Sequence, residues 1–119
     1  MASRITKSFA FDSAHWLPAV PEGHKCGRMH GHTYRVILGL EGELEPRLGW
    51  VQDYGEVSAA WASLKTALDH HCLNEIPGLE NPTAEVLAGW IFGRLKPGLP
   101  LLTDVTVQET PTTEAVYRP

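Results

Sequence analysis

The sequence predicts an α+β fold in which two helices pack on one face of a four-stranded antiparallel sheet, in the order β-β-α-α-β-β. Two long stretches of alternating residues lie near the N-terminus, two stretches with apolar residues at helical spacing follow, and two shorter alternating stretches come last. The chain has 119 residues, of which 43% are hydrophobic. This is enough for a single domain (residues 1–119) with one core.

The overall composition disfavours several classes of protein. A formal net charge of −4 gives no general basic face, so we expect no nucleic-acid partner. No apolar stretch is long enough to span a membrane, and the N-terminus lacks an apolar signal segment. We therefore expect a cytoplasmic protein with no membrane partner. Cys26 and Cys72 are too few for a disulfide framework and are expected to be reduced.

The first two strands are predicted over Ile5–His15 and His32–Glu43, with a loop of turn residues between them. His30 and His32 are two residues apart, so both imidazoles point to one face of an extended chain. If the two strands pair as an antiparallel hairpin, His15 at the end of the first becomes a neighbour of both.

Three imidazoles at neighbouring strand ends form a candidate metal site, and zinc is the ion that they suit best. His15, His30 and His32 would leave one tetrahedral position open, as in a catalytic zinc site. A His-x-His pair on a strand can also be incidental. Cys26 lies in the loop before His30 and allows another alternative, a closed structural site in which its thiol is the fourth ligand. The sequence alone leaves these alternatives open.

Two basic residues, Lys25 and Arg28, surround Cys26 in this loop. They are either part of a solvated loop or the source of a local positive field. Such a field would favour the thiolate form of the cysteine and would attract phosphate.

Two helices are predicted in the middle of the chain. The first follows Asp53, which forms a capping box with Glu56, and runs to about Leu68. The second has Asn81 as its N-cap and Pro82 at its first position. Each helix has a buried apolar stripe, made of Val57, Ala60, Trp61, Leu64 and Leu68 in the first and of Val86, Leu87, Trp90, Ile91 and Leu95 in the second.

Polar residues with two possible roles follow the first helix and end the third strand. In Asp69-His70-His71, a histidine either interacts with the helix dipole or acts with the carboxylate as a proton relay. The third strand is predicted over Leu101–Thr110, and Glu109 near its end is either a solvated carboxylate or a buried ligand anchor. A short fourth strand is predicted over Glu114–Arg118.

Five segments together make the sequence similar to the 6-pyruvoyl-tetrahydropterin synthase family, and the similarity runs nearly end to end. Three residues separate the cysteine from the His-Gly-His segment. This spacing resembles the bacterial branch that forms 6-carboxy-tetrahydropterin in the queuosine (7-deazaguanine) pathway. The segments are Phe11–His15, Pro21–His32, Leu68–His71, Glu75–Thr83 and Val107–Thr110.

The resemblance implies a tunnelling fold (T-fold), in which sheets join edge to edge into a barrel and two rings stack. The expected assembly is a homo-oligomer, commonly a hexamer (a dimer of trimers), with sites at the subunit junctions. Open sheet edges fit such an assembly better than a monomer. The implied substrate is the pterin 7,8-dihydroneopterin triphosphate. Its products would be 6-carboxy-5,6,7,8-tetrahydropterin, acetaldehyde and triphosphate, with no redox cofactor. Lys25 and Arg28 are our own candidates for triphosphate contacts.

The resemblance also implies a role for each candidate catalytic residue. Zinc on the three histidines would act as a Lewis acid, and Cys26 as thiolate would take a proton. Asp69 and His70 resemble the family's proton relay. Because adjacent side chains seldom bond each other well, we expect His70 to reach the Cys26 of another subunit. Glu109 resembles the anchor for the amino-pyrimidinone edge of the pterin.

Two alternative functions follow from the same residues. One is formation of 6-pyruvoyl-tetrahydropterin by triphosphate elimination and internal redox, because the same catalytic groups serve both reactions. The other is a non-catalytic, zinc-stabilised binding module in which Cys26 is a metal ligand.

Overall fold

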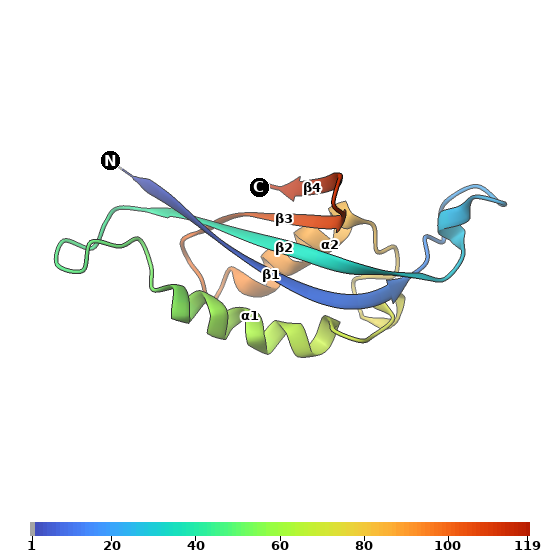
Figure 1. Cartoon of the computed structure of the whole chain (residues 1–119), viewed down its shortest axis with the longest axis horizontal. Coiled ribbons are helices and arrows are strands. Elements are labelled where there is room, and N and C mark those ends of the chain that lie inside the picture. The colour runs from blue at the N-terminus through green and yellow to red at the C-terminus, as the bar shows by residue number, and fades with distance from the viewer. Residues whose placement is uncertain (1) are drawn as a thin grey trace.

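The structure is a computed structural model that describes residues 2–119, and it has the predicted α+β architecture (Figure 1). The strands form one four-stranded antiparallel sheet in the order β1-β2-β3-β4, with both helices on the same side of it. The elements are β1 (Ser3–His15), β2 (His30–Gly42), α1 (Tyr54–Leu68), α2 (Ala84–Leu95), β3 (Leu102–Thr110) and β4 (Thr113–Tyr117). The predicted element order is confirmed. Two short 3-10 turns, η1 (Lys25–Gly27) and η2 (Leu73–Glu75), lie outside the predicted elements.

The long β1–β2 hairpin sets the positions of the candidate metal ligands. Its register pairs His15 with His30 and Ser13 with His32. The predicted start of β2 at His32 was two residues late, because His30 already pairs with the last residue of β1. The loop that carries Cys26 joins the two strands at this end of the hairpin.

The hydrophobic core lies between the sheet and the two helices. Alternate residues of β1 and β2 point into it, as expected of strands with one covered face. The Phe11 ring stacks on Tyr34 with centroids 4.9 Å apart, and Trp61 of α1 lies 6.0 Å from Phe11. The helices contribute most of their predicted stripes, except that Val86 is exposed. Fully buried core residues include Val36, Leu38, Leu40, Val57, Leu68, Leu87, Ile91, Val105 and Val107.

The helix caps differ from two predictions. Asp53 is the N-cap of α1, but its carboxylate accepts from Gly55 N–H, and Glu56 does not complete a capping box within the described residues. The N-cap of α2 is Thr83, whose hydroxyl accepts from Val86 N–H, so the predicted start at Asn81 and Pro82 was wrong. Pro82 instead lies in the extended segment before the helix, where its carbonyl faces His15.

The sheet face opposite the helices carries an ion pair that spans three strands and joins an exposed Arg4 to a buried Asp104. Arg4 of β1 reaches across β2 to Asp104 of β3, with Nη2 and Oδ2 2.6 Å apart. Gly39 of β2 lies beneath this pair, and a Cβ there would overlap atoms of both side chains. A larger residue at position 39 would therefore displace one or both of these side chains. Among residues 2–119, neither α-helix is long and apolar enough to cross a membrane.

Candidate metal centre and active site

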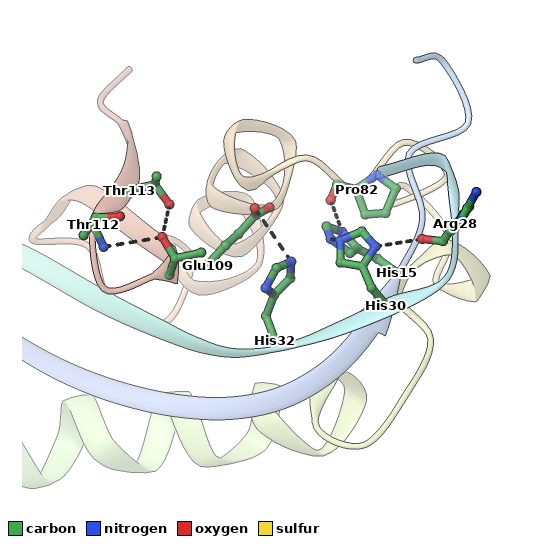
Figure 2. A network of polar contacts seen from close by, with 9 residues as sticks. His15, Arg28, His30, His32, Pro82, Glu109, Thr112 and Thr113 are labelled. Carbon is green, nitrogen blue, oxygen red and sulfur yellow. Dashed lines mark hydrogen bonds and ion pairs between the residues drawn. The ribbon is translucent and has the colours of Figure 1, made fainter. Parts of the chain in front are cut away.

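Three imidazoles meet where the β1–β2 hairpin ends, as the sequence predicted (Figure 2). His15, His30 and His32 each offer a ring nitrogen, and these three atoms lie within 4.8 Å of one another. We call these residues the histidine cluster. The pairing of His15 with His30 and of Ser13 with His32 brings them to one face of the sheet.

Backbone carbonyls fix the orientation of two of these rings. Nδ1 of His15 lies 2.8 Å from Pro82 O, and Nδ1 of His30 lies 2.7 Å from Arg28 O. A carbonyl only accepts, so each Nδ1 carries the hydrogen and each Nε2 keeps its lone pair. These two Nε2 atoms face each other at 3.0 Å. Two lone pairs cannot form a hydrogen bond with each other, and a cation bound between them would resolve the contact.

Burial favours the neutral, metal-binding form of two of these imidazoles, those of His15 and His32. It lowers the pKa of His15 below its ordinary value, against the opposing effects of the Pro82 carbonyl and the Glu109 carboxylate. Burial is also the largest cause that lowers the pKa of His32, while the charge of Glu109 raises it. His32 Nε2 is buried and has no hydrogen-bond partner in the described part of the chain. It is therefore a free donor atom aimed into the cluster.

The histidine cluster fits a zinc ion. Zn–N bonds of about 2.0–2.1 Å place tetrahedral nitrogen ligands about 3.3 Å apart, and the observed separations include 3.0 Å and none above 4.8 Å. The carbonyl partners of His15 and His30 supply the outer hydrogen bonds typical of metal-bound histidine. Within residues 2–119, the cluster contains no fourth His, Cys, Asp or Glu ligand, so Cys26 lies outside it.

Glu109 of β3 lies beside the cluster. Its Oε2 is 3.9 Å from His32 Nε2, which is too long for a hydrogen bond, and its side chain is one-quarter exposed (Figure 2). Glu109 lines a cavity of about 510 Å³ between the start of α2 and β4. Other residues that line this cavity are Leu17, Thr83, Ala84, Glu85, Thr113, Glu114, Ala115 and Val116.

Cys26 lies in η1, in the loop before the histidine pair, and is partly buried. Lys25 and Arg28 are exposed on either side of it. The backbone carbonyl of Arg28 accepts a hydrogen bond from Nδ1 of His30 in the cluster. In the described chain, the Cys26 thiol forms no hydrogen bond with Asp69 or His70. A single subunit thus does not bring the predicted base and relay together.

Asp69 and His70 follow α1 and lie along the outer edge of β1. The carboxylate of Asp69 accepts from Asp12 N–H at 2.9 Å and from His70 Nδ1 at 3.0 Å. These bonds, with that to Asp12 N–H the larger cause, lower the pKa of Asp69. Our expectation that adjacent side chains would not bond was wrong here. His70 has a φ of +57°, and this left-handed backbone accompanies the Asp69–His70 contact.

Sequence patterns did not single out Tyr34, the residue that lies beneath the cluster. Its ring centroid is 5.4 Å from that of His32 and 5.9 Å from that of His15. Its hydroxyl is buried without a hydrogen-bond partner in the described residues. Burial, and then the charge of Glu109, raise the pKa of Tyr34, so it remains a neutral donor. The only sequence signal was its place two residues after His32 on the same strand face.

Comparisons with known proteins agree with this geometry. A family model described as 6-pyruvoyl tetrahydropterin synthase matches residues 4–119. The chain belongs to this family. It is 41% identical to a 6-carboxy-5,6,7,8-tetrahydropterin synthase from Synechocystis, over 95% of this chain and 91% of the relative. It is also 33% identical to a dihydroneopterin monophosphate aldolase from Pyrococcus furiosus, over 84% of this chain and 81% of the relative.

Solved structures support the fold. The chain superposes on the 6-pyruvoyl tetrahydropterin synthase of Caenorhabditis elegans with a TM-score of 0.92 at 24% identity, over 100% of this chain and 96% of that one. The predicted T-fold subunit is therefore confirmed. In this member of a pterin synthase family, the histidine cluster and the adjacent Glu109 together form the candidate active site.

Proposed function

We propose that the protein is a zinc-dependent carbon–carbon lyase. It would convert 7,8-dihydroneopterin triphosphate and water to 6-carboxy-5,6,7,8-tetrahydropterin, acetaldehyde and triphosphate, in the route to queuosine. The observation that carries the proposal is the three-histidine cluster beside a carboxylate-lined cavity in a member of this family. The 41% identity to the Synechocystis 6-carboxy-tetrahydropterin synthase favours this product over others.

His15, His30 and His32 would hold the zinc through the nitrogens that their backbone contacts leave free. The bound ion would supply Lewis acidity that makes a neighbouring C–H of the substrate side chain more acidic. Glu109 would accept two hydrogen bonds from the amino-pyrimidinone edge and so orient the pterin in its cavity. Lys25 and Arg28, both exposed in the loop that carries Cys26, are the proposed triphosphate contacts.

Cys26 is the proposed general base that takes the substrate proton. Asp69 holds Nδ1–H of His70, which leaves the His70 Nε2 free to exchange protons. We infer that this relay serves the Cys26 of a neighbouring subunit in a hexamer, because the pair is not assembled within one chain. Mixing a Cys26→Ala protein with a His70→Ala protein tests the arrangement. Mixed oligomers regain activity if the two residues come from different subunits, and stay inactive if they come from one.

Product analysis separates this function from its alternatives. The purified protein with one zinc per subunit is incubated with 7,8-dihydroneopterin triphosphate, and the pterins are identified by mass. The proposal predicts 6-carboxy-tetrahydropterin and acetaldehyde. Accumulation of 6-pyruvoyl-tetrahydropterin would support the alternative elimination reaction. Aldol cleavage without a carboxylated pterin would place the chain with the Pyrococcus aldolase. Absence of any turnover would favour the zinc-stabilised binding module.

A further inference from the structure

The loop that carries Cys26 is held by one of its own side chains, that of His24. His24 is the N-cap of η1, and its Nδ1 accepts a hydrogen bond from Cys26 N–H at 3.1 Å. The His24 carbonyl accepts from Gly27 N–H at 3.0 Å, and His24 N–H donates to Pro21 O at 3.0 Å. This is the arrangement in which Asn or Asp commonly accepts from the N–H two residues later. His24 therefore organises the turn on both sides of the cysteine.

The backbone carbonyl of Cys26 is hydrogen-bonded to the segment that follows β1. This carbonyl accepts from Leu17 N–H at 2.8 Å. The neighbouring Trp16 is held by Asn74, which accepts from Trp16 N–H at 3.0 Å and donates to Trp16 O at 2.8 Å. The Cys26 carbonyl is thus held by a segment that Asn74 anchors. The Cys26 N–H is held by the imidazole of His24.

The direction of this hydrogen bond distinguishes His24 from the metal-binding histidines. His15 and His30 donate from Nδ1 to carbonyls and keep a lone pair on Nε2. His24 accepts at Nδ1, so its hydrogen lies on Nε2. Nδ1 of His24 is already occupied, and the residue lies outside the histidine cluster. Its role is therefore different, although it lies only six residues before His30.

We propose that His24 is a positioning residue for Cys26, and this rests on the proposed role of Cys26 as the general base. A base must lie within about 2.6–3.2 Å, measured between heavy atoms, of the group whose proton it abstracts. The backbone angles of Cys26 set the direction of its thiol, and the His24 cap restricts those angles. Misplacing a reacting group by about 1 Å can cost roughly 10²-fold in rate.

The test uses His24→Ala and His24→Asn in the zinc-loaded full-length protein. The Asn side-chain oxygen is separated from Cα by as many bonds as Nδ1 of His, so His24→Asn keeps the cap. His24→Ala is expected to raise the deuterium exchange rate of the Cys26 amide about fivefold, as for a lost N-cap. It should lower kcat about 10- to 100-fold with KM within about twofold. His24→Asn should restore both quantities, and the exposed neighbour Glu22→Ala should change neither.

Cys26→Ala and zinc analysis keep the two proposals distinguishable. If Cys26→Ala is fully active, the proposed base is wrong and His24 has no base to position. If Cys26→Ala is inactive but His24→Ala keeps full kcat, only the His24 proposal is overturned. Failure of His24→Asn to restore kcat would also overturn it. Loss of zinc from His24→Ala would show a role in the metal centre instead.

Discussion

Replacing Glu109 with Gln tests whether this residue binds the pterin without contributing to zinc binding. The Gln side chain has the same shape but loses the charge and one of two acceptor oxygens. Hydrogen bonds to a charged group contribute about 1.5–3 kcal/mol. A loss of this size corresponds to about a 10- to 150-fold rise in the dissociation constant of a pterin ligand. Zinc content should stay near one per subunit, since the group of side chains that could hold a metal consists of the three histidines and does not include Glu109.

The assay is isothermal titration of the zinc-loaded protein with an unreactive pterin analogue, combined with metal analysis of the same samples. Glu85→Gln is the matched control, because Glu85 lines the same cavity at the start of α2. We expect its dissociation constant to stay within about twofold of the parent value. An unchanged affinity for Glu109→Gln would refute the anchor role. Loss of zinc from that variant would show that the carboxylate supports the metal.

Replacing His15, His30 or His32 with alanine is expected to abolish zinc binding, measured by metal analysis, and to abolish activity. Circular dichroism should still show a folded chain. Cys26→Ala should keep zinc and the oligomer but lose about 10²–10⁴-fold in rate, measured by single-turnover kinetics. Gly39→Ala should lower the free energy of unfolding by about 1–3 kcal/mol, measured with urea, because the new Cβ overlaps side-chain atoms of Asp104 and Arg4. In metal-free protein, stability should fall as pH drops below 6.5, the ordinary pKa of histidine, because burial lowers the pKa of His15 and the unfolded chain binds more protons. His15→Gln should flatten that pH dependence in thermal melts.

Patterns within the chain were sufficient for most of the fold. The alternation in the two N-terminal strands predicted their pairing, and that pairing predicted that His15 would meet His30 and His32. Local rules failed where a tertiary contact competed with them. Asn81 and Pro82 are favourable residues for a helix start, yet the Pro82 carbonyl is used by His15 and the helix begins after Thr83.

The remaining parts of the site depend on contacts that no sequence pattern specifies. The Asp69–His70 bond depends on a left-handed backbone at His70 and on Asp12 of a distant strand. The buried hydroxyl of Tyr34 becomes notable only once its surroundings are known. The cap that His24 forms on Cys26 has no signature of its own, because histidine is not among the residues that usually form such turns.

The central claim is that the three histidines bind zinc and the Cys26 thiol does not. Zinc X-ray absorption on the full-length, zinc-loaded protein tests this claim most directly. The separation of Cys26 from the histidine cluster predicts a shell of nitrogen and oxygen atoms at about 2.0–2.1 Å, with no sulfur. The spectrum of Cys26→Ala should then match that of the parent. A sulfur atom at about 2.3 Å in the parent, lost in Cys26→Ala together with the metal, would contradict the account and make the cysteine a structural ligand.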